Sequence, residues 1–454
     1  MIDMMTETKM HSPLTLVDSL MKQASDAQEL YRTASQETVD YVVGKAAEKL
    51  TSHSMHLAKL AQKETGFGNA EDKNIKNLFA SEILYNSIKD MPTVGIIEEI
   101  PEKKMLKIVA PLGVLVALIP STNPTSTTIF KVLLALKTKN AIILSPHPRA
   151  LQAIKETVSL FKEVLQACGL PIDLVQLLEE PTIEDTQKLM AHPDTDLILA
   201  TGGKAMVRIA YSSGNPAIGV GPGNTPALLE KSADIAKAVD QIIRSKTFDY
   251  GTICASEQAL VVEQSIKDTV ISELKANHGY LLNQEESERL ADFITTAEGG
   301  LNPRIIGQPA VKIAEMSGLS VPSDTKILVS EQTVIAKDNP YAREKLSPIL
   351  AFYTVADAEE GIRFCQELLK IQGAGHTAVV HTKDDTFVRE FGLAIPSARI
   401  LVNTQAALGA IGGTTNLNPS LTLGCGSHGG GSTSENIHVA QLLNTHYIAY
   451  DVEK

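Results

Sequence analysis

The stretch "VLVALIPSTNPTSTTIFKVLLALKTKNAIILSPHPRA" (residues 114–150) contains two short apolar runs, residues 114–119 and 141–144. The pattern continues on its C-terminal side, with apolar runs at residues 174–178, 197–200 and 227–229 and helix-like stretches such as 150–167 and 204–213. Short apolar runs separated by helices are typical of a parallel sheet that is covered on both faces. We therefore predict an α/β fold, and such sheets bind nucleotides at the carboxyl ends of their strands.

The pattern changes on either side of this region. The first hundred residues are predicted to be helical, with Ser12 and Pro13 as a start signal. One helical face there is apolar: Val39, Val42, Val43, Ala46, Ala47 and Leu50. After residue 254 the alternation restarts with "ALVVE", "ILAFYTV", "HTAVVHT" and "ARILVNT", which predicts a second α/β domain. The glycine-, serine- and threonine-rich segment 409–434 is typical of a functional loop.

Composition restricts the class of protein. The 454 residues carry a net charge of −12, which gives no overall reason to expect nucleic acid or an anionic membrane as partner. There is no uninterrupted apolar run of about 18 residues, so no transmembrane helix is predicted. The N-terminus does not resemble a secretory signal. Four cysteines without a CxxC pair argue against disulfides and a zinc site. We predict a soluble cytoplasmic protein without a bound metal.

Four motifs carry possible chemistry, and each has a plainer interpretation. In "SKTFDYGTICASEQ" (residues 245–258), Cys254 lies in a polar turn and is either incidental or an accessible nucleophile. The glycines of "ATGGKAM" (200–206) either cradle a phosphate or form a tight turn. Asn123 in "IPSTNPTS" either caps a helix or stabilises an oxyanion. His376 in "GAGHTA" is either a satisfied histidine or a general base.

Taken together and in order, these segments resemble the CoA-acylating branch of the aldehyde dehydrogenase superfamily. That branch includes the aldehyde half of bifunctional aldehyde–alcohol dehydrogenases and CoA-dependent succinate-semialdehyde and sulfoacetaldehyde dehydrogenases. The resemblance runs from about residue 15 to the C-terminus. Its most specific pieces are "STNPTSTTIFKVLLALKTKNAIILSPHPRA", "ATGGKAMVRIAYSSGNPAIGVGPGNTPALLE", "TFDYGTICASEQ" and "LNPSLTLGCGSHGGGSTSEN".

The resemblance implies a role for individual residues. Cys254 matches the nucleophile that forms a hemithioacetal and then a thioester, Asn123 matches the oxyanion donor, and His376 matches a histidine of this branch that assists acyl transfer. NAD⁺ or NADP⁺ is the implied hydride acceptor, with NAD⁺ favoured, and coenzyme A the implied acyl acceptor. The implied cofactor contacts are Ser121, Thr122, Ser145, His147, Pro148, Thr201, Gly202, Gly203, Gly221 and Glu344, of which Glu344 matches the ribose ligand.

Three departures from the superfamily pattern bear on function. Hydrolytic members carry a glutamate where this chain has no acidic residue between Thr201 and Leu229, so water would be poorly activated and a thioester would await CoA. Ser145 replaces a lysine near the adenosine ribose. His428 stands where relatives often have tryptophan; it either favours a small anionic aldehyde or lies on the surface. A hydrolytic enzyme that releases a free acid, or a catalytically silent assembly subunit, are the alternatives.

The resemblance also implies an organisation. Two doubly wound, Rossmann-like parallel-sheet domains and a small β oligomerisation extension are implied. An NAD(P)-binding domain with a helical N-terminal part would occupy residues 1–245, and the catalytic domain that carries the cysteine nucleophile would occupy residues 246–415. Residues 416–454 would form a return segment and an oligomerisation strand, for which "YIAY" is the candidate. A homodimer or larger homo-oligomer is implied. The substrate would be acetaldehyde-like or a small anionic aldehyde, and the free cytoplasm is favoured over a protein-shelled compartment.

Overall fold

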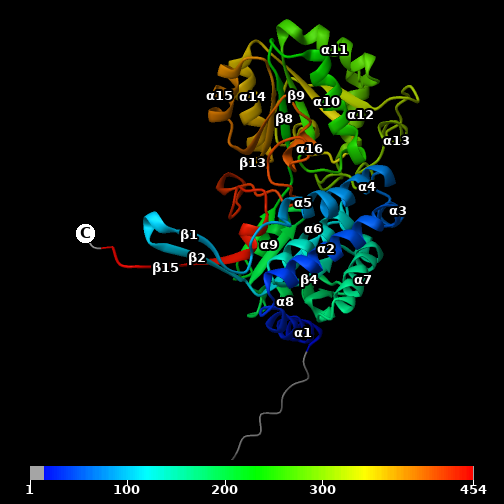
Figure 1. The fold of residues 1–454 in the computed structure, drawn as a ribbon. Helices are drawn as coiled ribbons and strands as arrows, with labels where there is room; N and C mark the ends of the chain where they lie inside the picture. The colour runs from blue at the N-terminus through cyan, green and yellow to red at the C-terminus, as the bar shows by residue number, and fades with distance from the viewer. Residues whose placement is uncertain (1–14, 453–454) are drawn as a thin grey trace, which may run out of the picture.

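The computed structural model describes residues 15–452, which form two α/β lobes and a projecting antiparallel arm (Figure 1). The N-terminal helices are α1 (Leu16–Tyr31), α2 (Gln36–Ser52), α3 (Ser54–Thr65), α4 (Ala70–Leu78) and α5 (Leu84–Ile88). Thr15 caps α1 in a reciprocal capping box with Asp18, while the predicted start at Ser12 and Pro13 lies outside the described residues. All six apolar residues predicted on one face of α2 are buried.

The first lobe contains a five-stranded parallel sheet in the order β5-β4-β3-β6-β7. Its strands are β3 (Val114–Ile119), β4 (Ala141–Pro146), β5 (Val175–Leu177), β6 (Leu197–Thr201) and β7 (Ala217–Val220). Its helices are α6 (Pro124–Lys137), α7 (Leu151–Ala167), α8 (Ile183–Ala191) and α9 (Lys204–Tyr211). The predicted runs at 114–119, 141–144, 174–178 and 197–200 are confirmed as strands, whereas β7 was not predicted.

The order of these strands locates a ligand site. The chain moves outward from β3 through β4 to β5 and then returns to place β6 on the other side of β3. The loops that follow β3 and β6 therefore leave the sheet in opposite directions, and the crevice between them is the usual ligand site of a doubly wound sheet.

The second lobe contains a seven-stranded parallel sheet in the order β10-β11-β12-β9-β8-β13-β14. Its strands are β8 (Thr225–Leu229), β9 (Glu257–Glu263), β10 (Gly279–Leu281), β11 (Ile327–Glu331), β12 (Ile349–Val355), β13 (Gly375–His381) and β14 (Ser397–Val402). Its helices are α10 (Ile235–Thr247), α11 (Lys267–Ala276), α12 (Gln284–Ile294), α13 (Ala310–Met316), α14 (Ala358–Ile371), α15 (Asp385–Ala394) and α16 (Ala406–Ala410).

The change from one sheet to the other falls between β7 and β8. Strand β8 pairs with β9 and β13, although it precedes residue 245, where the first predicted domain ends. Residues 225–245 thus contribute to the second sheet and its cover, because α10 packs its buried face into the same core as β8 and β9. The division of the chain into domains at 245 and 415 stays a prediction, and it does not coincide with this change of sheet.

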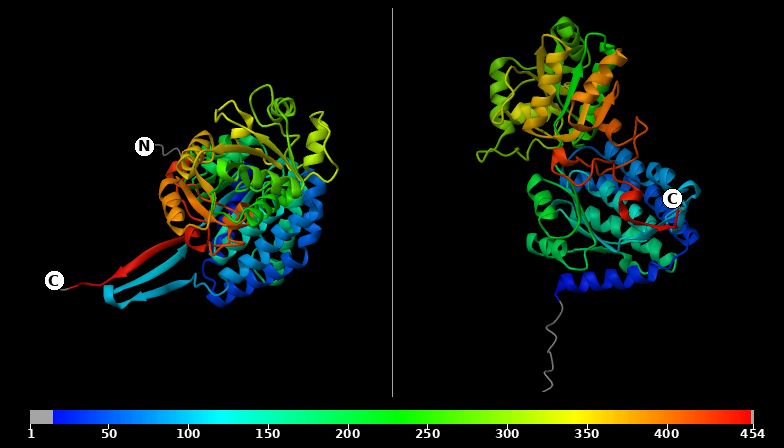
Figure 2. Two further views of the ribbon diagram at one scale, coloured as in Figure 1. Left: turned by 90° about the horizontal axis from the view of Figure 1, so that it is seen from above. Right: turned by 90° about the vertical axis from the view of Figure 1, so that its left-hand side faces the viewer.

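The third element is an antiparallel arm made of β1 (Gly95–Ile100), β2 (Met105–Pro111) and β15 (Leu443–Ala449). It extends away from both lobes in Figure 1 and in the left view of Figure 2. The predicted terminal strand is β15, and the arm is the small β extension implied by the sequence resemblance. Within residues 15–452, no helix is both long and apolar enough to cross a membrane.

Candidate active site

A cavity of about 440 Å³ lies where the carboxyl edge of the five-stranded sheet faces the loop that carries Cys254. Twelve of the thirteen predicted site residues line it: Asn123, Cys254, Ser121, Thr122, Ser145, His147, Pro148, Thr201, Gly202, Gly203, Gly221 and Glu344. The thirteenth, His376, lies behind Cys254 and contacts its sulfur. The structure therefore brings all thirteen predicted residues together, and their individual roles stay predictions.

Cys254 lies on a loop that is held in an unusual backbone conformation. The loop follows α10 and passes through three consecutive residues with left-handed φ angles, Asp249 (47°), Tyr250 (51°) and Gly251 (78°). Left-handed conformations are costly for Asp and Tyr and persist only where surrounding contacts enforce them. The glycine-rich segment before β8 approaches the same loop, because a Cβ on Gly223 would lie 1.9 Å from the carbonyl oxygen of Cys254. These contacts fix the position of the Cys254 thiol at the wall of the cavity.

His376 is fully buried, and its side chain reaches the Cys254 thiol from the second residue of β13. Its Nε2 lies 3.2 Å from the Cys254 Sγ, and its Nδ1 lies 2.9 Å from the hydroxyl of Thr377. Burial lowers the pKa of His376 to about 3 and raises the pKa of Cys254 to about 12. In the resting protein the pair is therefore a neutral imidazole and a thiol, and the His376 Nε2 lies within reach of the thiol proton.

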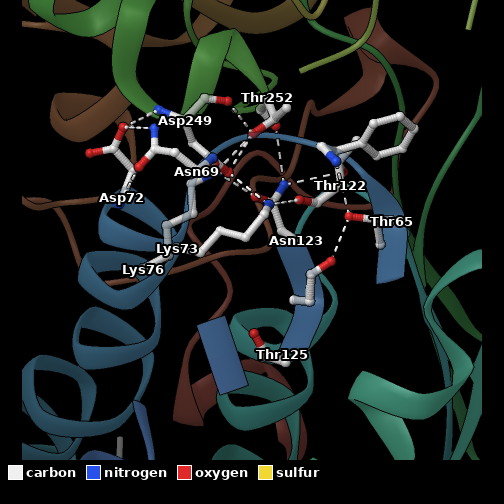
Figure 3. Close-up of polar contacts among 12 residues, drawn as sticks. Thr65, Asn69, Asp72, Lys73, Lys76, Thr122, Asn123, Thr125, Asp249 and Thr252 are labelled. Carbon is white, nitrogen blue, oxygen red and sulfur yellow. Dashed lines mark hydrogen bonds and ion pairs between the residues drawn. The ribbon is translucent and has the colours of Figure 1, made fainter. Parts of the chain in front are cut away.

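Asn123 lies at the start of α6 and faces a buried cluster of charged residues (Figure 3). Its Oδ1 accepts a hydrogen bond from the Lys76 Nζ at 2.6 Å. Its Nδ2 lies 3.1 Å from the carbonyl oxygen of Thr252 and 3.2 Å from the hydroxyl of Thr122, both on the cavity wall. The amide nitrogen is thus the group that Asn123 directs to the side of the cavity where Cys254 lies.

The charged cluster of Lys73, Lys76 and Asp249 was not predicted from the sequence. Lys73 and Lys76 of α4 both contact the buried carboxylate of Asp249, at 3.0 and 2.5 Å. In the sequence they belong to "EDKNIKN", which has the composition of a solvated helix. The burial of these lysines depends on the packing of α4 against the loop that precedes Cys254, and a single sequence contains no signal for that contact.

Glu344 is the one acidic side chain among the described residues that line the cavity. Its Oε1 accepts a hydrogen bond from the amide of Gly223 at 3.1 Å. Burial raises the pKa of Glu344 to about 8. A carboxyl group that is mostly protonated at pH 7 and is hydrogen-bonded to a backbone amide can also bond to hydroxyl groups of a bound ligand.

The part of the cavity formed by residues 201–203 suits a phosphorylated cofactor. Gly202 and Gly203 leave open space where a side chain would lie, and no side chain of the described residues caps the N-terminus of α9. The hydroxyl of Thr201 is buried and has no partner within residues 15–452. Free amides at a helix N-terminus beside an unpaired hydroxyl form a fitting cradle for phosphate oxygens.

Two side chains of the implied cofactor set have hydrogen-bond partners within the protein. Ser145 shares a hydrogen bond of 2.8 Å with the hydroxyl of Thr186, and the His147 Nδ1 accepts from the amide of Arg149. His428 is exposed and is not among the residues that line the cavity. Of the two interpretations of His428, the structure therefore supports the one that places it on the surface.

A doubly wound sheet with a cavity at its carboxyl edge is typical of enzymes that bind nucleotides. A cysteine at the wall of that cavity is typical of enzymes that use a thiol as nucleophile. Residues 8–415 match the model of the Aldehyde dehydrogenase family. The chain belongs to this family.

Three relatives indicate the branch within the family. The bifunctional aldehyde-alcohol dehydrogenase AdhE of Escherichia coli strain K12 is 46% identical over 442 residues, which cover 96% of this chain and 50% of AdhE. This chain thus spans about half the length of that relative. The crystal structure of an acetylating aldehyde dehydrogenase from Geobacillus thermoglucosidasius matches with a TM-score of 0.95 and 47% identity, covering 96% of this chain and 97% of the other. A propionaldehyde dehydrogenase of Rhodopseudomonas palustris, with bound CoA and an acylated cysteine, matches with a TM-score of 0.86 and 28% identity over 96% and 97% of the two chains.

Proposed function

We propose that this chain is a CoA-acylating aldehyde dehydrogenase, which converts a short-chain aldehyde to its acyl-CoA in a reversible reaction that uses NAD(P)⁺. One observation carries the proposal: Cys254 and its buried partner His376 meet at a cavity in which the one acidic side chain, among the described residues, is the engaged and mostly protonated Glu344. The relative with bound CoA and an acylated cysteine supports the same acceptor.

The residues of the chain account for the chemistry at Cys254. The Sγ atom bonds to the aldehyde carbon while its proton passes to the Nε2 of His376, 3.2 Å away. The aldehyde oxygen becomes an oxyanion, for which the Asn123 Nδ2 and the amide of Cys254 are the donors. NAD(P)⁺, held by the residues after β3, β4 and β6 together with Glu344, supplies the hydride acceptor when bound. As the hydride leaves, the oxyanion re-forms the carbonyl and a thioester remains on Cys254. The thiolate of CoA attacks this carbonyl to form acyl-CoA, and Cys254 leaves as a thiolate that takes back the proton from His376.

The two alternatives from the sequence make different predictions. A hydrolytic enzyme would need Glu344 as the base for water, and Glu344 bonds to Gly223 instead. A silent assembly subunit would not need Cys254, Asn123 and Glu344 around one cavity. We therefore favour the acylating enzyme.

We propose that the aldehyde is uncharged and short, such as acetaldehyde or propionaldehyde. The residues that line the cavity together with Cys254 include five apolar side chains: Ile253, Leu346, Ile411, Leu421 and Leu423. Among the described residues that line the cavity, Lys76 is the one lysine or arginine, and its three donors are already used by Asn123, Asp249 and Thr252. A sulfonate or carboxylate on the substrate would therefore lose its hydration without gaining a cation that has a free donor. Sulfoacetaldehyde and succinate semialdehyde become the less favoured substrates.

The remaining inferences concern the cofactor and the assembly. We propose NAD⁺ as the preferred form and the cytoplasm as the location, both from the sequence. We also propose that the arm joins two subunits of a homodimer or larger oligomer. Exposed apolar side chains on and just beyond β15, among them Tyr447, Ile448 and Tyr450, support a role in association.

Turnover with and without CoA tests the proposal. Purified protein would be given NAD⁺ or NADP⁺ with acetaldehyde, propionaldehyde, sulfoacetaldehyde or succinate semialdehyde, and both reduced cofactor and acyl product would be measured. We expect cofactor reduction to require CoA, to yield acyl-CoA and to be fastest with an uncharged aldehyde. Equal turnover without CoA that releases a free acid, and that is lost in Glu344→Gln, would establish the hydrolytic alternative.

A further inference from the structure

The charged cluster beside Asn123 has a geometry that goes beyond anchoring a loop. The Lys76 ammonium is buried and donates to three acceptors, the Asn123 Oδ1 at 2.6 Å, the Asp249 Oδ2 at 2.5 Å and the Thr252 hydroxyl at 2.9 Å. An ammonium group has three donors, so each is used. Figure 3 shows Lys73 and Lys76 reaching from the same helix toward these partners.

The contact with Lys76 decides which way the Asn123 amide faces. Lysine donates hydrogen bonds and accepts none, so only the amide oxygen can lie at 2.6 Å from its Nζ. A flipped amide would place its NH₂ group against the ammonium. The Nδ2 is therefore held against the Thr122 hydroxyl and the Thr252 carbonyl oxygen. Both threonines line the cavity, as does Cys254.

The same contact changes the donor strength of Asn123. A cation on the amide oxygen draws electron density from the amide and makes its N–H groups stronger donors, since hydrogen-bonded groups polarise one another and do so most in a desolvated site. Burial lowers the pKa of Lys76 to about 8, with Asp249 opposing that effect, so the ammonium form prevails at pH 7.

We propose that Lys76 is a positioning residue for the oxyanion site: it orients the Asn123 amide and polarises it toward the charge that develops when the thiol of Cys254 adds to the aldehyde. The inference rests on the thiol-addition step of the proposed function, and not on CoA as the acceptor. The oxyanion would take the place of the Thr122 hydroxyl, which lies 3.2 Å from the Asn123 Nδ2 and is the longer of its two contacts.

Lys73 offers a matched control within the cluster. It binds the same Asp249 oxygen at 3.0 Å, but its second acceptor is the carbonyl of Thr122 rather than Asn123. Replacing either lysine leaves Asp249 one buried cation, and replacing Lys76 also removes a hydrogen bond to the Thr252 hydroxyl of the loop. Only the replacement of Lys76 removes the cation from the amide of Asn123.

The experiment is a double-mutant cycle on the NADH burst without CoA, which requires thiol addition and hydride transfer only. The proteins are wild type, Lys76→Gln, Asn123→Ala, the double variant and Lys73→Gln, with acetaldehyde and NAD⁺ at saturation. We expect Asn123→Ala to slow the burst about a hundredfold or more, as for other single oxyanion donors. Lys76→Gln should slow it about tenfold in the wild type and less than about twofold in the Asn123→Ala background, because coupled residues are not additive.

Further readouts separate this role from a structural one. The burst amplitude and the affinity for NADH should stay within about twofold in Lys76→Gln, while the rate alone falls. Lys76→Arg, which keeps the charge, should recover part of the rate, and it replaces Lys76→Gln in the cycle if that variant does not fold. Equal slowing by Lys76→Gln with and without Asn123, or slowing by Lys73→Gln of the same size, would overturn the proposal. Release of acid instead of acyl-CoA in steady state would overturn the proposed acceptor and leave this coupling measurable.

Discussion

The two sides of the Cys254 loop are buried in opposite ways. On one side the Cys254 sulfur contacts His376, whose other ring nitrogen contacts Thr377, and burial keeps the thiol and the imidazole uncharged. On the other side Lys73, Lys76 and Asp249 are charged although they are almost inaccessible to water. Burial alone would raise the pKa of Asp249, but the ammonium groups of Lys76 and Lys73 outweigh it and lower that pKa.

The difference shows how charge is distributed before the reaction begins. A buried charge persists only where a partner of opposite sign and further hydrogen bonds replace its hydration. The cluster of Lys73, Lys76 and Asp249 meets this condition and is set before the substrate arrives. The Cys254–His376 pair does not meet it, so its charges form only when the thiol attacks. The protein thus holds a fixed positive charge beside Asn123, the proposed oxyanion donor, and keeps Cys254 as a thiol until the proposed attack.

Removing the thiol of Cys254 should abolish nearly all activity. Cys254→Ala should lower the rate of aldehyde oxidation at least about 10⁴-fold, since removal of a covalent nucleophile has effects of this size or larger. Cys168→Ala, which changes a half-buried cysteine at the end of α7, should leave the rate within about twofold of wild type. Cofactor reduction by both variants measures the effect. Substantial turnover by Cys254→Ala would show that the reaction does not pass through this thiol.

Removing the carboxylate of Asp249 should destabilise the charged cluster. Asp249→Asn leaves two buried ammonium groups without a counter-charge and should lower the free energy of unfolding by about 3–5 kcal/mol. The control is Asp26→Asn, which breaks the exposed Lys22–Asp26 pair and should cost no more than about 1 kcal/mol. Urea denaturation of both variants makes the comparison. Equal midpoints would mean that the cluster contributes no stability.

Replacing the base sharpens the assignment of the uncharged side. His376→Gln should slow the CoA-free burst about a hundredfold, because a positioned general base typically contributes at least this much. His428→Gln should leave the burst unchanged, since His428 is exposed and outside the cavity lining. An unaffected burst in His376→Gln would mean that a group other than His376 accepts the thiol proton.

The pH dependence of alkylation reports the charge of the resting thiol. Because the pKa of Cys254 is raised to about 12, the thiolate fraction should rise about tenfold per pH unit between pH 7 and 9 without levelling off. The rate of inactivation by iodoacetamide, with the Cys254 peptide followed by mass spectrometry, measures this rise. A rate that is constant above pH 7 would instead indicate a preformed thiolate.

The sequence predicted those parts of the molecule that local patterns encode. Strands β3, β4, β5 and β6 were predicted because parallel strands buried on both faces form continuous apolar runs. The hairpin β1–β2 was not predicted from its own residues, because "GIIEEI" is largely exposed and has no such run. The residues around the cavity were found through turns and family motifs, which mark where the backbone bends.

The charged cluster lay beyond this kind of reasoning. Lys73 and Lys76 lie on a helix of polar composition, and nothing in their spacing distinguishes a buried ammonium from a solvated one. Their partner Asp249 lies more than 170 residues away, and the left-handed backbone at Asp249 and Tyr250 has no glycine to mark it. Such contacts become visible only when the helix and the loop are placed together in three dimensions.

The fate of the acyl group on Cys254 shows whether CoA or water is the acyl acceptor. The protein would be incubated with acetaldehyde and NAD⁺ without CoA, and the Cys254 peptide would be analysed by mass spectrometry before and after CoA is added. We predict that the peptide gains the mass of an acetyl group, that this group persists in water, and that CoA removes it as acetyl-CoA. Rapid loss of the acetyl group as free acetate before CoA is added would contradict the account.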